Sequence, residues 1–146
     1  MLINKTGDIF ETRQPALGHG VNTHGLMGAG IAVAFRRKFP EIFVPYETAC
    51  HTGALTAGGV LPIQTKTGQW VFNIASQDRP GKHARLSWLK EGMEATLHFC
   101  KEENISGIAI PRIGAGIGGL KWEEVYETLE ELAEQYDPVD VEIWSL

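Results

Sequence analysis

The sequence predicts an α/β fold in which a largely parallel sheet is covered by helices on both faces. Short apolar runs typical of strands alternate with longer stretches in which apolar residues recur at three- and four-residue spacing. Two glycine-rich turns, at residues 25–32 and 114–120, each follow a short apolar run and precede a helical pattern. The 146 residues have the composition of an ordinary globular protein, and we expect residues 1–146 to form one domain.

The first half of the chain contains two predicted strands and one predicted helix. Leu2-Ile3 is the first strand, and the turn Gly7-Asp8-Ile9 follows it. The apolar run 16–21 is the second strand. A helix is expected near 29–39, because its apolar residues fall at helical spacing and Pro40 marks its end.

The second half alternates in the same way. Residues 60–65 and 70–74 are predicted to form two strands that are joined by a turn at 66–69. A long amphipathic helix follows, and its apolar face contains Leu86, Leu89, Met93 and Leu97. The chain then shows a short strand at 108–110, a helix from about Trp122, and a closing strand at 139–144 whose period-two pattern predicts one partly wet face.

Composition and charge narrow the classes of function. The formal net charge of −5 argues against non-specific nucleic-acid binding, which needs a basic face. No run approaches the length of a membrane span, and the N-terminus lacks a signal-peptide pattern. Cys50 and Cys100 are in no metal-like cluster, and reduced thiols favour a cytoplasmic protein. We therefore expect no metal, no cofactor and no membrane partner.

The two glycine-rich turns are suited to binding an anion. Such a turn points several backbone N–H groups at one spot, and a following helix N-terminus adds partial positive charge. Two of them at equivalent strand-to-helix junctions predict two walls around one phosphate-bearing ligand. The order Gly25-x-x-Gly28-x-Gly30 is not the Rossmann order, and neither turn ends in a Walker lysine. A dinucleotide dehydrogenase or a P-loop phosphotransferase is therefore not favoured.

Three polar residues near these turns are candidate ligand contacts, and each has a plain structural alternative. Asp8 could accept a hydrogen bond from an exocyclic amine such as that of adenine, or it could cap a turn. Asn22 could both donate to and accept from ribose hydroxyls, or it could hold the turn through its own backbone. His24 could donate to a phosphate or act as an acid or base, although a lone loop histidine is usually inert.

These residues, taken together, resemble a known family. Gly7-Asp8-Ile9, Val21 to Ala32 and Pro111 to Trp122 are similar in order and content to the motifs of macrodomains, closest to the branch of the terminal ADP-ribose protein glycohydrolase and the DarG-like antitoxins. The resemblance spans essentially the whole chain. It implies a three-layer α/β/α sandwich with a mixed, mostly parallel central sheet, and a site for ADP-ribose.

The resemblance also implies roles for individual residues. Asp8 would accept from the adenine amino group beside the Ile9 backbone amide, and Asn22 would face the terminal ribose. The diphosphate would lie between two walls, Gly28, Ala29, Gly30 and Ile31 on one side and Gly114, Ala115, Gly116, Ile117 and Gly118 on the other.

The catalytic residues of that branch match poorly. Its terminal-glycohydrolase type uses a lysine after the middle strand and an aspartate in the second glycine turn, where this chain has Gln77 (or Ser76) and Gly118. We therefore expect hydrolysis of ADP-ribosyl esters on acidic side chains without a lysine intermediate, with Asn22, Gln77 and Arg85 as orienting groups. Removal of phosphate from ADP-ribose 1″-phosphate, and recognition without chemistry, are the alternatives. The expected partners are ADP-ribose and ADP-ribosylated proteins, and ADP-ribosylated nucleic acid stays open.

Overall fold

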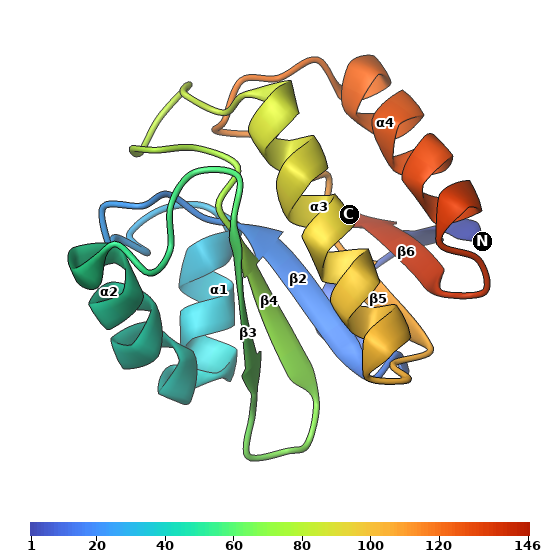
Figure 1. The fold of residues 1–146 in the computed structure, drawn as a ribbon, viewed down its shortest axis with the longest axis horizontal. Helices are drawn as coiled ribbons and strands as arrows, with labels where there is room; N and C mark the ends of the chain where they lie inside the picture. Colours follow the sequence, from blue (N-terminus) through green and yellow to red (C-terminus); the bar gives the residue numbers. More distant parts are fainter.

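The computed structural model describes residues 1–146 and contains one six-stranded sheet flanked by helices (Figure 1). The strands are β1 (Leu2–Thr6), β2 (Ala16–Gly20), β3 (Val60–Gln64), β4 (Trp70–Ile74), β5 (Gly107–Ile110) and β6 (Asp140–Ser145). The α-helices are α1 (Ile31–Lys38), α2 (Phe43–Thr52), α3 (Leu86–Glu102) and α4 (Trp122–Gln135), and two 3-10 turns are η1 (Ile9–Glu11) and η2 (Pro40–Ile42).

The sheet has the strand order β1-β6-β5-β2-β4-β3. Its neighbouring strands are parallel except for β3, which pairs antiparallel with β4 across the 65–69 turn. The predicted mixed, mostly parallel sheet is therefore confirmed. Because parallel strands need covering on both faces, this arrangement also requires two layers of helices.

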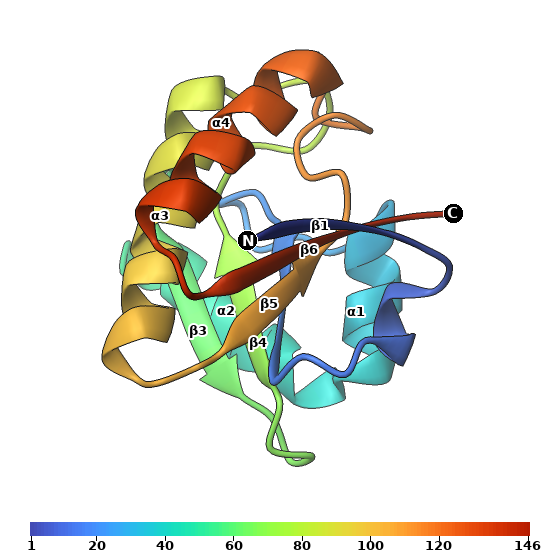
Figure 2. The ribbon, with the colours of Figure 1, turned by 90° about the vertical axis from the view of Figure 1, so that its right-hand side faces the viewer.

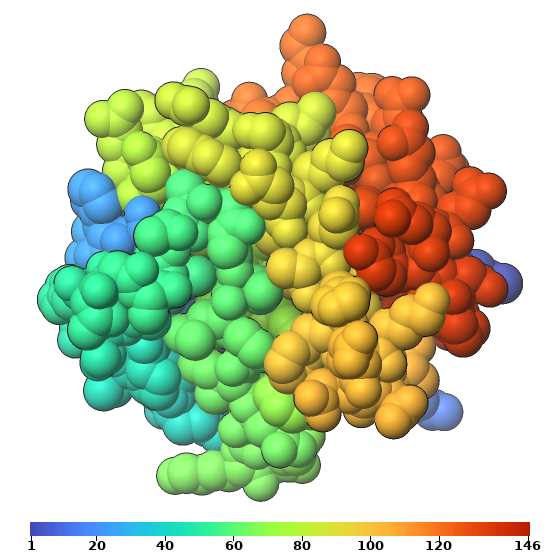
Figure 3. All heavy atoms as spheres, viewed as in Figure 1, coloured from blue at the N-terminus to red at the C-terminus, as the bar shows by residue number.

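The helices form one layer on each face of the sheet, as Figure 2 shows edge-on. Alternate residues of each strand enter opposite cores: Ala16 packs beneath α3 and α4, whereas Leu17 packs beneath α1 and α2. The space-filling view in Figure 3 shows α2, the β3–β4 segment, α3 and α4 side by side across one face of the molecule. None of the helices combines the length and the apolar character that a membrane crossing requires.

Two local features differ from the sequence prediction. Helix α2 was not predicted, and it buries only Tyr46 and Ala49, one turn apart, with Pro45 in its first turn, where proline is tolerated. The polar face of β6 is also less exposed to solvent than the sequence predicts. Glu142 is buried, because its carboxylate accepts hydrogen bonds from Thr12 Oγ1 at 2.6 Å, Trp144 Nε1 at 2.9 Å and Gln14 Nε2 at 3.1 Å.

The topology brings three loops to one edge of the sheet. Strands β5, β2 and β4 are neighbours and parallel, so the segments that follow them meet beyond their carboxyl ends. These segments are residues 111–121, 21–30 and 75–85, and the first two contain the glycine-rich turns. Ligands of open α/β sheets bind at such an edge.

Candidate functional site

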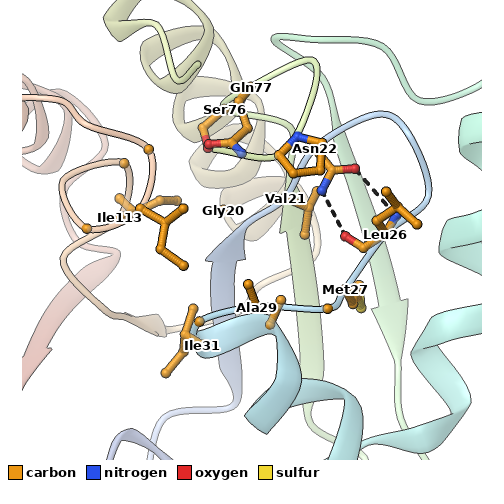
Figure 4. A pocket seen from close by; sticks show the side chains of 18 of the residues that line it. Gly20, Val21, Asn22, Leu26, Met27, Ala29, Ile31, Ser76, Gln77 and Ile113 are labelled. Carbon is orange, nitrogen blue, oxygen red and sulfur yellow. Dashed lines mark hydrogen bonds between the residues drawn. The ribbon is translucent and has the colours of Figure 1, made fainter. Parts of the chain in front are cut away.

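A cavity of about 630 Å³ lies between these three loops. Its wall includes both glycine-rich turns, the end of β4 and the facing sides of α1 and α2. Figure 4 shows Ser76 and Gln77 together at one side of it, with Asn22, Ile113, Ala29 and Ile31 around the same space. A cavity of this size, with few polar side chains and many backbone groups in its wall, suits a small organic ligand.

The first glycine turn is held in shape by Asn22. Its Oδ1 accepts from the backbone N–H of His24 at 2.9 Å. Figure 4 shows its two hydrogen bonds with Leu26, in which Oδ1 accepts from the Leu26 N–H at 3.4 Å and Nδ2 donates to the Leu26 carbonyl at 2.8 Å. The structural alternative that the sequence left open is therefore realised. One Nδ2 hydrogen is left to face a ligand, and the carbonyl oxygen is already engaged.

Tyr46 of α2 also holds this turn in place, through hydrogen bonds from its hydroxyl group to Asn22. Its hydroxyl donates to the Asn22 carbonyl at 2.7 Å and lies 3.1 Å from Asn22 Oδ1. The side chain is fully buried, and burial raises the pKa of the phenol above its usual value, so the hydroxyl stays protonated and remains a donor. The sequence did not indicate this contact, because Tyr46 lies in the helix that the patterns missed.

The two glycine turns meet at one point and leave a gap elsewhere. Gly30 has φ 62° and ψ −148°, a region that is essentially restricted to glycine, and a Cβ there would lie 2.9 Å from Ile117 Cδ1 of the opposite turn. A Cβ at Gly28 or at Gly116 would meet nothing within 4 Å. The two turns are therefore in contact at Gly30 and Ile117, and they leave open space at Gly28 and Gly116, which also line the cavity.

The loop 77–84 ties the two turns together. The Asp78 carbonyl accepts from Thr23 Oγ1 at 3.0 Å, and the Ala84 N–H donates to the Gly118 carbonyl at 3.2 Å. Pro80 and Gly81, in the middle of this loop, line the cavity. The walls are therefore fixed relative to each other by backbone contacts.

Gln77 and Gly118, which stand where the resembled family has lysine and aspartate, face each other. A Cβ on Gly118 would lie 3.2 Å from Gln77 Oε1, and only 2.8 Å from both Ala84 Cβ and the Gly114 carbonyl oxygen. The Gln77 amide Nε2 donates to the Arg79 carbonyl at 2.8 Å. The local backbone thus leaves no room for an aspartate at 118, and Gln77 retains its amide oxygen toward the second turn.

Most of the predicted site residues lie in the cavity wall, and four do not. Asn22, Gln77, Gly28, Ala29, Gly30, Ile31, Gly114, Gly116, Ile117 and Gly118 line it. Asp8, Ile9, Ala115 and Arg85 are outside this wall, as is His24. The cavity therefore has both glycine turns in its wall, and Asp8 and Arg85 are not among the residues that line it.

Asp8 and Arg85 have local partners instead. Asp8 Oδ1 accepts from the Phe10 N–H at 3.0 Å and caps η1, which is the structural alternative for this residue. The Arg85 guanidinium is exposed and lies 4.4 Å from the centre of the Trp88 ring. A role for either side chain in ligand binding stays a prediction.

The cavity also has residues that sequence reasoning missed. Its ionisable lining side chains are Arg36, Glu47 and Arg112. Arg36, at the exposed basic end of α1, stacks 3.7 Å over the centre of the Phe43 ring at the cavity wall. Arg36 follows Ala32 by one helical turn, so the helical period from the first glycine turn could have placed it on this side.

Comparisons with known proteins agree with this geometry. A family model described as Macro domain matches residues 19–129. The chain is 33% identical over 149 residues to a DNA ADP-ribosyl glycohydrolase of Mycobacterium tuberculosis, covering 99% of this chain and 42% of that protein. It is 26% identical over 141 residues to a human ADP-ribose glycohydrolase, covering 96% of this chain and 88% of the human enzyme.

A solved structure, the macrodomain of Mycobacterium tuberculosis DarG, superposes with a TM-score of 0.92 at 32% identity, covering all of this chain and 98% of that one. The chain spans less than half the length of the mycobacterial glycohydrolase that it matches. Because the family model covers most of the sequence and the fold follows the same layers, the chain belongs to the Macro domain family.

Proposed function

We propose that this chain binds ADP-ribose in the cavity and hydrolyses ADP-ribosyl groups from modified acidic side chains of proteins. The observation that carries the proposal is that both glycine turns line one cavity, in which a Cβ at Gly28 or Gly116 would meet nothing within 4 Å. Backbone amides of two glycine turns and the N-terminus of α1 can neutralise a diphosphate there, so an acidic protein needs no basic side chain for it.

The ligand is oriented by the remaining polar groups. The diphosphate lies between Gly28–Ile31 and Gly114–Gly118, and the terminal ribose lies toward Asn22 and the end of β4. The free Nδ2 hydrogen of Asn22 donates to a ribose hydroxyl. The family resemblance places the adenine toward Asp8 and Ile9, which lie outside the residues that line the cavity.

The reaction needs no side-chain nucleophile. A water attacks the anomeric carbon, the bond from that carbon to the ester oxygen breaks, and the electron pair leaves with the carboxylate. The proton lost by the water ends on solvent or on the released carboxyl group. Because the carboxylate is a good leaving group, holding the sugar and the water in place supplies much of the rate. Gln77 Oε1, which points toward Gly118, orients the water.

The cavity composition supports a mechanism without a lysine–sugar intermediate. No lysine lines it, and Lys82 lies against Gly119 with an exposed side chain. The aspartate route is equally disfavoured, because the backbone around Gly118 excludes a side chain.

Hydrolysis of ADP-ribose linked to nucleic acid is the second candidate. It is favoured by the similarity to proteins named DNA ADP-ribosyl glycohydrolase. The loop beside the cavity also carries the exposed basic side chains Arg79, Lys82 and Arg85, although the chain as a whole is acidic. The cytoplasmic location expected from the cysteine content stays a prediction.

A turnover assay tests these proposals. The protein is incubated with a glutamate-linked mono-ADP-ribosylated protein, with an ADP-ribosylated DNA oligonucleotide and with ADP-ribose 1″-phosphate, and released ADP-ribose and phosphate are measured. Release of ADP-ribose from the ester, with no adduct trapped by borohydride, is the expected result. Release from DNA alone identifies the second candidate, and release of phosphate alone identifies a phosphatase. Binding of ADP-ribose without any release identifies a recognition module, and absence of binding refutes the proposal.

A further inference from the structure

Ser76 has an unusual environment for a buried serine. It directly follows Ala75 at the end of β4, is 2% exposed and lines the cavity. Its backbone is fixed, since its N–H donates to the Ile74 carbonyl at 2.8 Å and its own carbonyl accepts from the Arg85 N–H at 3.1 Å. Figure 4 shows it next to Gln77 and close to Gly20 and Ile113.

The Ser76 hydroxyl makes no hydrogen bond within the protein. Buried polar side chains are nearly always paired, and the sealed polar atom without a partner in this protein is His19 Nδ1 rather than Ser76 Oγ. The Ser76 hydroxyl is therefore unpaired but still reachable, and its reachable side belongs to the cavity that the residue lines.

A glycine on the adjacent strand keeps this hydroxyl accessible. A Cβ at Gly20 of β2 would lie 2.7 Å from Ser76 Oγ and 3.1 Å from Ile113 Cγ1. Any larger residue at position 20 would turn the hydroxyl away or cover it. Two independent features thus mark the Ser76 hydroxyl as a polar group open to the cavity. It has no hydrogen-bond partner within the protein, and Gly20 beside it has no side chain to cover it.

The other polar groups nearby have less to offer a sugar. Asn22 has one free N–H and no free acceptor. Gln77 donates one of its two Nε2 hydrogens to the Arg79 carbonyl and keeps the other together with Oε1, but it is only partly buried. Ser76 is the buried side chain among these that keeps both a free donor and free acceptor lone pairs. A ribose hydroxyl also donates and accepts, so it pairs with such a group in both directions.

We propose that the Ser76 hydroxyl contacts the terminal ribose of ADP-ribose and so distinguishes ADP-ribose from ADP. This inference rests on the proposed function and adds to it a residue that determines specificity. A site that hydrogen-bonds a substrate hydroxyl discriminates against a ligand that lacks it, because the polar group of the site is then left unpaired.

Calorimetry with ADP-ribose and with ADP tests this contact in the wild-type protein, in Ser76→Ala and in Ser87→Ala. Ser87 is an exposed serine of α3 outside the cavity and serves as the matched control. We expect Ser76→Ala to bind ADP-ribose about 3- to 10-fold more weakly, the range of one neutral hydrogen bond. Its affinity for ADP and its thermal midpoint should equal those of the wild type, because no bond within the protein is lost.

The outcomes separate the inference from the proposed function. If the wild type binds ADP-ribose and Ser76→Ala binds it equally well, the Ser76 contact is refuted and the proposed function stands. If Ser76→Ala loses ADP and ADP-ribose affinity in parallel and melts earlier, the residue is structural and the inference is again wrong. If the wild type binds neither ligand, the proposed function itself fails.

Discussion

Acid should destabilise this protein through one buried histidine. His19 lies in the middle of β2 with no exposed surface, its ring stacked on Phe35 with the centroids 4.1 Å apart. Its Nε2 lies 2.7 Å from Asn73 Oδ1, and its Nδ1 has no partner. The neutral ring, protonated on Nε2, satisfies this geometry. A second proton on Nδ1 would place a charge in an apolar layer with nothing to pair with it.

The magnitude follows from the shift in pKa. Burial lowers the pKa of the His19 imidazole from 6.5 to about 4, and the hydrogen bond to Asn73 offsets this only in part. The unfolded chain therefore takes up a proton near pH 6.5 that the folded chain refuses until about pH 4. The contribution of His19 to the free energy of unfolding is constant above pH 7. It falls by about 3 kcal/mol as the pH drops from 6.5 to 4.

Urea unfolding at a series of pH values measures this loss. Carboxylates also titrate in this range, and the pKa of Glu142 is lowered in the fold through its hydrogen bonds, although burial opposes this. The pH profile of the wild type must therefore be compared with that of His19→Gln, which retains an amide donor for Asn73 and cannot be protonated. The difference in unfolding free energy between the two proteins should shrink by about 3 kcal/mol between pH 7 and pH 4. Parallel profiles would show that His19 is not held neutral in the fold.

Three further changes test the site. Gly116→Val places a side chain in open space, since nothing lies within 4 Å of the Cβ position. Calorimetry should therefore show loss of ADP-ribose binding while the melting temperature is unchanged, and retained binding would contradict the placement of the diphosphate beside Gly116. Tyr46→Phe removes the 2.7 Å donor to the Asn22 carbonyl and should cost about 1–3 kcal/mol in urea unfolding, whereas wild-type stability would show that this bond is not important. Asp8→Ala should cost about 1 kcal/mol of stability through the lost cap and weaken ligands with adenine by roughly 1–2 kcal/mol, and unchanged affinity would remove Asp8 from the site.

The elements that the sequence predicted well have continuous apolar runs or helically spaced apolar residues. Strand β4 matches the predicted 70–74, whose last four residues are all buried, and α3 buries the predicted Leu89, Met93 and Leu97. Helix α2 escaped prediction because its apolar residues do not follow a continuous stripe. Tyr46 and Ala49 are buried, while Val44, between Phe43 and Pro45, is exposed.

The site was predictable to the extent that backbone forms it. Glycine-rich turns after apolar runs can be recognised in the sequence, and parallel strands then bring them to one edge. Side-chain contacts across loops cannot be obtained in this way. No sequence pattern indicates that Asn22 Oδ1 accepts from the backbone N–H groups of His24 and Leu26, or that Glu47 reaches the cavity from α2.

The pair Gln77 and Gly118 illustrates why a substituted catalytic position must be judged in its local structure. From sequence, each residue is simply a mismatch with the resembled family. In the fold, the loop 77–84 lies so close to the second glycine turn that a Cβ at 118 would be 2.8 Å from Ala84 Cβ, and the Gln77 amide faces the same point. An aspartate at 118 would require this loop to move, and that loop also carries Gln77 and the contact with Thr23 of the first turn. The residues at positions 77 and 118 are therefore coupled through this loop, and replacing either one alone would not rebuild the lysine–aspartate arrangement of the resembled family.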